Sequence, residues 1–463
     1  MFVRIQKCLR EFEQEEQNKE ASEELKGMLP GMIVEQIAAI LLENVNIFLM
    51  GLISTAAIAG VGQINTVNNI LMNLFQAFAI GGTVVTARYA GARDEKRAKM
   101  ASSSALLLGL TVSLICTGIL FVFRSEFVSL LFGKAAPDVI ENSLRYFTVT
   151  VLTPPLWFLY FQCCGLMRSG GDTKRPMIVS VILNISGVAL NVMLTLGFKM
   201  GVSGAAMAYL LSVGLAAVVG LFMVFRPSFL LRPALGTGKQ FKKEAGAILG
   251  IALPSSGENL MFNGSRIVIQ VFLAGMGTVM ISANSVFNSV NGIFNIPAMT
   301  LYYLAVPVIG RAAGRGDAKS VKHALGYLAR KTIVWSIPVA ACHLFLAVPG
   351  SLLFTREPQV VRVASIMLMM YAVFALMQAG SFILPNGFKA VGDAKFAMVV
   401  SSATAWTIRV FGTWLLGVKL GMGAYAIVLT QGIDTAVRAA VYTVRFRRGT
   451  WLNTDTRDQR RSL

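Results

Sequence analysis

The chain has 463 residues, of which 55% are hydrophobic and only 14% are charged. Soluble proteins typically contain about 45–50% apolar and about 25% charged residues, so this composition excludes an ordinary soluble protein and indicates a membrane protein. The formal net charge is +19. In a membrane protein such an excess is typical of cytoplasmic loops rich in Lys and Arg, and it requires no nucleic-acid partner.

The hydrophobic residues fall into runs long enough to cross a bilayer. Residues 11–24 hold seven acidic side chains before the first such run, which predicts a cytoplasmic tail rather than a signal peptide. A transmembrane helix needs roughly 20 mostly apolar residues. Twelve transmembrane helices are predicted on this basis, at residues 29–50, 62–87, 100–123, 143–166, 176–197, 203–225, 247–273, 281–309, 325–349, 362–385, 396–417 and 423–445.

The basic residues predict the orientation of these helices. Loops on the same side as the N-terminus carry 21 Lys and Arg residues, against seven on the opposite side and its flanks. Both termini are therefore expected in the cytoplasm, and the protein is expected to be a multi-pass protein of the plasma membrane. The predicted organisation is a tail (1–27), a six-helix bundle (28–226), a cytoplasmic linker (227–246), a second six-helix bundle (247–447) and a C-terminal tail (448–463).

The two predicted bundles are internal repeats. Matching residues recur at an offset of 223, and a second set recurs at an offset of 221. Six helices in each copy return the chain to the same side, so the copies are parallel repeats, an arrangement common in secondary transporters with a binding site near the midplane. The pairs at offset 223 are Glu35 with Glu258, Asn65 with Asn288, Asn68 with Asn291, Arg88 with Arg311 and Asp94 with Asp317, and those at 221 include Gly171 with Gly392 and Asp172 with Asp393.

Several motifs resemble those of a known transporter family. The stretches that carry the resemblance are Leu166-Met-Arg168-Ser-Gly-Gly171-Asp172-Thr-Lys174-Arg-Pro176, Gly250-Ile-Ala-Leu-Pro254-Ser-Ser-Gly-Glu258-Asn259, Val308-Ile-Gly310-Arg311, Trp406-Thr-Ile-Arg409 and Asp434-Thr-Ala-Val-Arg438. In order and spacing they are similar to the MATE (multidrug and toxic compound extrusion) transporters, and to their bacterial DinF-like branch. The resemblance implies two six-helix bundles facing a central cleft, and export of organic cations or drugs driven by inward flow of H⁺ or Na⁺.

An acidic residue in the seventh predicted helix is the first candidate for a cation or substrate site. An ionisable side chain at membrane depth is costly, so it indicates function. Glu258 lies one turn after Pro254, where a helix break is predicted to free backbone carbonyls beside the carboxylate, and Asn259 follows it. One carboxylate that binds either a coupling cation or a cationic substrate meets the minimum requirement for antiport. The alternative is that Glu258 has only a structural role, with its carboxylate hydrogen-bonded at the start of a helix. Eight residues rise about 12 Å, so Arg266 is too far along the helix to pair with Glu258.

The other candidate polar residues follow from the repeat and from the resemblance. Glu35 is the repeat partner of Glu258, and Glu43 is a possible substitute for the first-helix aspartate of the family, whose position Asn46 occupies. The resemblance also implies cation or substrate contacts at Asn191 and Gln378. Relatives carry an aspartate four residues after the position of Asn191, which this chain does not have, and an acidic residue in the tenth helix at the position of Gln378.

Asparagines are dense in the second and eighth predicted helices. Asn65, Asn68, Asn288 and Asn291 are spaced so that each pair shares a helix face. They are predicted to line the cleft, with hydrogen bonding between helices as the alternative. Arg266, Arg409 and the Asp434–Arg438 pair are interpreted as stabilising the bundles, and Asp172 and Asp393 are predicted to cap helices.

The sequence offers little for catalysis or metal binding. Its five cysteines show no CxxC spacing, and its two histidines lie twenty residues apart. The sequence therefore predicts no metal and no cofactor. The favoured function is a monomeric antiporter in the lipid bilayer that exports amphipathic, cationic organic compounds in exchange for H⁺ or Na⁺. The alternatives are a lipid-linked saccharide or lipid flippase of the same superfamily and, more remotely, a membrane-embedded enzyme.

Overall fold

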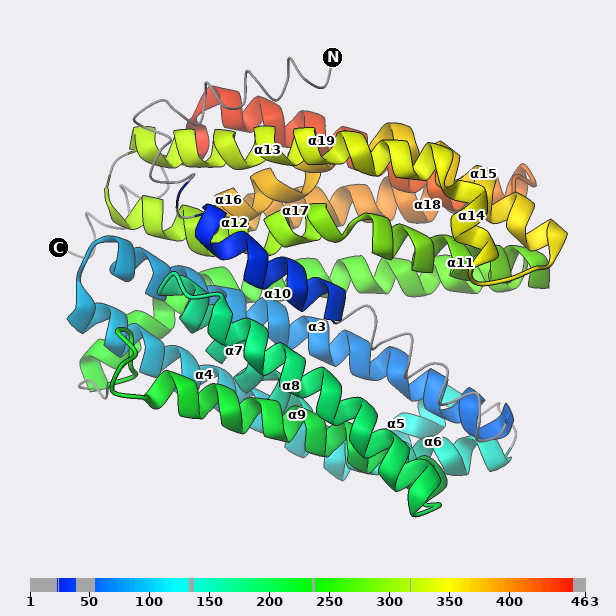
Figure 1. The fold of residues 1–463 in the computed structure, drawn as a ribbon, viewed down its shortest axis with the longest axis horizontal. Coiled ribbons are helices and arrows are strands. Elements are labelled where there is room, and N and C mark those ends of the chain that lie inside the picture. The colour runs from blue at the N-terminus through cyan, green and yellow to red at the C-terminus, as the bar shows by residue number, and fades with distance from the viewer. Residues whose placement is uncertain are drawn as a thin grey trace. The chain divides into compact units, whose positions relative to one another are not determined.

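The computed structural model describes residues 23, 25–38, 55–132, 137–234, 238–316 and 318–452, and all regular secondary structure within these residues is helical (Figure 1). The chain divides into two compact units. The N-terminal unit is Pro30–Ser256, and the C-terminal unit is Gly257–Leu463 together with the described part of Met1–Leu29. The boundary falls inside one long helix, so each unit contains part of it.

The N-terminal unit is a bundle built around two long helices. The helix α3 packs against α4, α6 and α7, and α9 packs against α6, α7 and α8. Leu114, Ile115 and Val122 of α4 are exposed, as expected for a face in contact with lipid. The elements are residues 30–38 of the helix over 25–38, α3 (Thr55–Gly91), α4 (Glu95–Val122), α5 (Arg124–Phe132), α6 (Pro137–Thr150), α7 (Pro154–Ser169), α8 (Lys174–Asn191), the π-helix η1 (Val192–Gly197), α9 (Gly201–Phe225) and the first part of α10 (Gly238–Ala274).

The C-terminal unit has more interruptions in its helices. Its last three segments before α19 alternate between α- and π-helix, and a short π-helix also precedes α16. The elements are the second part of α10, α11 (Thr278–Phe294), α12 (Ile296–Gly314), α13 (Ala318–Phe345), α14 (Ala347–Leu352), α15 (Pro358–Ala375), η2 (Ala379–Ile383), α16 (Leu384–Ala390), α17 (Ala394–Thr404), η3 (Ala405–Val410), α18 (Phe411–Thr413), η4 (Trp414–Lys419), α19 (Tyr425–Arg448) and the 3₁₀-helix η5 (Thr450–Leu452).

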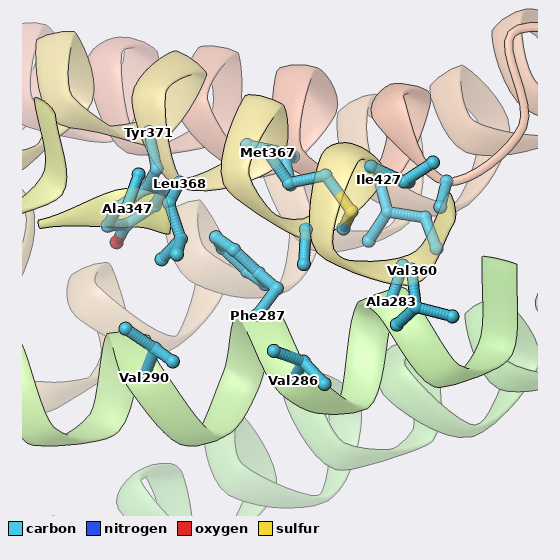
Figure 2. Close-up of a cluster of buried hydrophobic side chains, with 14 of the residues drawn as sticks. Ala283, Val286, Phe287, Val290, Ala347, Val360, Met367, Leu368, Tyr371 and Ile427 are labelled. Atoms are coloured by element: carbon cyan, nitrogen blue, oxygen red, sulfur yellow. The ribbon is translucent and has the colours of Figure 1, made fainter. Parts of the chain in front are cut away.

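The core of the C-terminal unit lies where α11, α15 and α19 meet. Figure 2 shows one face of α11 pointing at α15 and Ile427. Phe287 packs edge to face on Tyr371, with ring centroids 5.8 Å apart. The spacing of three and four residues along α11 places its apolar side chains on this single face. The labelled members are Ala283, Val286, Phe287 and Val290 of α11, Ala347 of α14, Val360, Met367, Leu368 and Tyr371 of α15, and Ile427 of α19.

A close approach of α15 and α19 depends on Gly432. A Cβ atom at this position would lie 2.1 Å from Cδ2 of Phe374. We expect Gly432→Ala to destabilise the unit by about 1–3 kcal/mol, because overpacking outweighs the gain in helix propensity. The check is the unfolding temperature of the purified protein in detergent micelles. Gly326→Ala is the matched control, since Phe446 is 3.8 Å from that Cβ. Equal unfolding temperatures for the two variants would contradict the expectation.

Six described helices are long and apolar enough to cross a membrane by themselves, or seven if the bent pair of Ile140–Thr150 and Pro154–Ser169 counts as one span. The six are Ile64–Gly91, Glu95–Val122, Lys174–Thr195, Gly201–Phe225, Ile296–Gly314 and Pro358–Ala375. Of the first predicted span, 29–50, the structure describes only residues up to 38.

The predicted helix break at Pro254 is wrong. The helix α10 continues through this proline from Gly238 to Ala274. Proline removes one backbone N–H, so within a continuous helix it frees the carbonyl four residues earlier, at Gly250, and does not free a group of carbonyls around Glu258.

Candidate functional site

The carboxylate of Glu258 lies in an ion pair inside the C-terminal unit. Lys389, on α16, places its Nζ 2.7 Å from Oε2 of Glu258, and the two side chains are only 4% and 14% exposed, respectively. Ser401 of α17 donates a hydrogen bond of 2.9 Å to Oε1. As the sequence indicated, Glu258 does not pair with Arg266. The partner that neutralises it lies 131 residues away in the sequence.

The repeat partner Glu35 is paired in the same way within the N-terminal unit. Nη2 of Arg168, at the end of α7, lies 2.5 Å from Oε1 of Glu35, and both side chains are largely buried. Arg168 and Lys389 each precede the repeated Gly-Asp by three residues, so they correspond at the offset of 221. The repeat therefore conserves a complete ion pair in both units.

A cavity adjoins the Glu258–Lys389 pair. Its volume is about 110 Å³. Glu258 is the one acidic side chain among its lining residues, and the aromatic rings of Phe262 and Tyr302 form part of its wall. The lining also includes Asn259, one of the predicted site residues. The remaining lining residues are Ser381, Phe382, Pro385, Asn386, Lys389 and Arg438.

A chain of buried amides crosses the C-terminal unit. Gln378 donates a hydrogen bond of 2.7 Å to Oδ1 of Asn295, and Asn295 donates one of 2.6 Å to Oδ1 of Asn291. The chain ends on α13 at His343, whose Nε2 lies 3.0 Å from the same Asn291 oxygen. Two predicted site residues, Gln378 and Asn291, therefore belong to one hydrogen-bonded network within a bundle. Asn288 is exposed and lies outside it.

No role is predicted for His343 from the sequence. Its Nδ1 lies 2.8 Å from the carbonyl oxygen of Val339, so both ring nitrogens face oxygen atoms. The ring is fully buried and packs against Phe294 and Tyr371. Only tertiary packing brings this isolated histidine to the amide chain.

A cluster of charges joins α19 to η3. Nη2 of Arg438 lies 2.8 Å from Oδ2 of Asp434, which confirms the ion pair expected from the i, i+4 spacing. Nε of Arg409 lies 3.9 Å from the same oxygen. The ring of Phe262 packs against both guanidinium groups, with its centroid 4.7 Å from Cζ of Arg409 and 5.7 Å from Cζ of Arg438.

The predicted polar residues of the N-terminal unit lie in separate places. Asn65 accepts a hydrogen bond of 3.0 Å from the hydroxyl of Tyr146, and Asn191 accepts one of 2.8 Å from Thr195. Asn68 is buried. Glu43 and Asn46 lie outside the described residues.

The two repeated aspartates have different roles. Asp172 accepts hydrogen bonds from the backbone N–H groups of Lys174 and Arg175, which confirms that it caps α8. The capping role predicted for Asp393 is wrong, because its side chain makes no capping hydrogen bond and instead lies 2.6 Å from Nη2 of Arg445. Burial raises the pKa of the Asp393 carboxyl, and the guanidinium of Arg445 opposes that rise.

Comparison with known proteins identifies the chain's relatives. The sequence profile of the MatE family matches residues 31–193 and 254–415. The two matched segments begin 223 residues apart, the offset of the internal repeat. An uncharacterized transporter of Bacillus subtilis, YisQ, is 25% identical over 88% of this chain and 90% of its own length. A probable multidrug resistance protein of Thermotoga maritima, NorM, is 23% identical over 92% of both chains.

Solved structures share the fold. A multidrug resistance MATE family transporter of the MOP superfamily, seen in an outward-facing conformation, has a TM-score of 0.85, with 18% identity over 93% of this chain and 96% of that one. A MOP superfamily transporter from Pyrococcus furiosus has a TM-score of 0.84, with 19% identity over 94% and 97%. The predicted fold class is therefore confirmed as all-α, with twelve transmembrane helices in two bundles. With the family profile matching most of the chain, this protein is a member of the MATE family of membrane transporters.

Proposed function

We propose that this protein is a secondary active antiporter that exports small amphipathic, cationic organic compounds in exchange for H⁺ or Na⁺ by alternating access. Curated relatives named as a probable multidrug resistance protein and as a multidrug export protein support export of drugs or toxic compounds. The observation that carries the coupling is the ion pair of Glu258 with Lys389 beside a cavity.

The ion pair supplies the competition that antiport requires. The ammonium of Lys389 already occupies one oxygen of the Glu258 carboxylate. A proton or Na⁺ that binds this carboxylate has to displace Lys389, and a cationic substrate that enters the cavity has to compete for the same negative charge. Each cation therefore weakens the binding of the other, and exchange across the membrane follows when the two are released on opposite sides.

The proposed orientation of the chain in the membrane rests on its basic residues. We propose a monomer in the plasma membrane with both termini in the cytoplasm, because the basic residues of the sequence lie mainly in the loops on the side of the termini. Within it, the proposed six-helix bundles are residues 28–226 and 247–447, joined by a cytoplasmic linker at 227–246.

The test is efflux of a cationic dye from proteoliposomes under separately imposed H⁺ and Na⁺ gradients. We expect one gradient to drive efflux by the wild-type protein, and Glu258→Gln to lose this coupling, since a neutral amide holds neither cation by charge. Glu35→Gln is the matched variant at the repeat position. Comparison of coupled efflux by the two variants shows which of the two units the coupling depends on. If neither gradient drives efflux of any cationic dye, or if Glu258→Gln inserts normally and keeps full coupling, the proposal is refuted.

A further inference from the structure

The charged cluster of the C-terminal unit carries more positive than negative charge. Arg409 and Arg438 share the single carboxylate of Asp434. Glu258 and Lys389 neutralise each other nearby. Two guanidinium groups therefore face one carboxylate, which leaves an excess of one positive charge.

The excess is not compensated within the described part of the chain. The buried Nε atoms of Arg409 and Arg438 have no hydrogen-bond acceptor there. Arg409 and Arg438 are 6% and 5% exposed. Buried charges without partners are costly in proteins and especially in membranes, where they mark binding sites. An anionic group that enters the cluster would remove this cost.

The structure provides a space for such a group. Arg438 is part of the wall of the 110 Å³ cavity, together with Phe262, whose ring packs against both guanidinium groups. One water molecule takes a share of about 30 Å³ in the liquid, so the cavity can hold a group of the size of a carboxylate. Guanidinium groups bind planar carboxylates with two parallel hydrogen bonds, and the aromatic ring fixes the plane of each guanidinium.

We propose that Arg409 and Arg438 form an anion site that binds the acidic group, such as a carboxylate, of the exported compound. This inference rests on the proposed function in one respect, that the bound compound is exported, and it specifies the chemical class of that compound. A preferred substrate is a zwitterionic amphipath whose cationic group competes for Glu258. Its acidic group binds Arg438 in the cavity wall and Arg409, whose contact with Asp434 is too long for a hydrogen bond at 3.9 Å.

The test compares the binding of two dyes that differ at one group. Rhodamine B carries a free carboxylate, and its ethyl ester has the same ring system and the same positive charge without the carboxylate. We expect the wild-type protein in lipid nanodiscs at pH 7.5 to bind rhodamine B about tenfold more tightly, the effect of one charge-assisted hydrogen bond. In Arg409→Gln this preference should fall to about twofold or less, with the affinity for the ester unchanged. Fluorescence polarisation measures all these affinities.

Two controls make the result specific. Lys419→Gln removes an exposed positive charge from the same unit and should keep the tenfold preference. Benzoate should displace rhodamine B from the wild-type protein where benzamide does not, a comparison that needs no variant to fold. Equal affinities of the wild-type protein for the two dyes, or an unchanged preference in Arg409→Gln, would overturn the anion site. Binding requires no ion gradient, so a failure of gradient-driven efflux with an intact dye preference would contradict the export mechanism and leave the anion site standing.

Discussion

Replacement of Lys389 by methionine is expected to destabilise the C-terminal unit by about 3–5 kcal/mol, because it leaves the carboxylate of Glu258 without its charged partner. The two side chains are 2.7 Å apart and mostly buried, so water compensates the remaining charge poorly. For a unit of about 200 residues, this loss corresponds to a decrease of roughly 10 °C in unfolding temperature. Differential scanning fluorimetry of the purified protein in detergent micelles measures it.

The double variant Glu258→Gln with Lys389→Met is the control for this prediction. It removes both charges, so we expect it to recover most of the lost stability, since neutral replacements of a buried ion pair are often nearly neutral in free energy. Arg168→Met should behave like Lys389→Met, because Arg168 is paired with the mostly buried Glu35 in the other unit. A double variant as unstable as Lys389→Met alone would show that lost packing, and not the uncompensated charge, determines the effect.

Replacement of Asp434 by asparagine is expected to have a similarly large effect, about 3–5 kcal/mol. Asp434 is completely buried and is the one carboxylate in contact with both Arg409 and Arg438 among the described residues. Its loss leaves their like charges to repel each other at membrane depth. We expect a lower unfolding temperature that sodium benzoate partly restores, because an added carboxylate can occupy the anion site.

Asp172→Asn is the matched control for the loss of one aspartate charge. Asp172 is only partly buried and caps α8 through its Oδ1, and asparagine caps helices about as well as aspartate. The substitution should therefore leave the unfolding temperature nearly unchanged. If Asp434→Asn were as well tolerated as Asp172→Asn, the excess charge of the cluster would have no energetic weight and the basis of the anion site would be lost.

The sequence predicted most of the fold because the relevant signals are local or repeated. Apolar runs such as those of α4 and α9 are continuous in the sequence, and the bilayer imposes helical structure on them. The two-copy organisation followed from residue matches at offsets of 223 and 221. The clear error in an element, at Pro254, arose because one proline in a long helix removes a single hydrogen bond, which the surrounding packing tolerates.

The candidate site was only half predictable. Glu258, Asn259, Asn291 and Gln378 were found because polar side chains are rare in apolar runs and therefore noticeable. Their partners were not found, because Lys389 and His343 are distant in sequence and each has an ordinary interpretation where it stands. The small cavity and the contact of Phe262 with two arginines depend on side chains from several helices meeting at one depth.

Composition, periodicity and repeated motifs are properties of the chain alone, so they were enough to predict a helical membrane protein with two copies of one bundle. The ion pairs of the two repeated acids, and the excess of positive charge beside the cavity of the C-terminal unit, became visible only in the folded chain. Coulomb interactions and desolvation act over distances of a few ångströms, and packing alone brings residues more than a hundred positions apart to that distance.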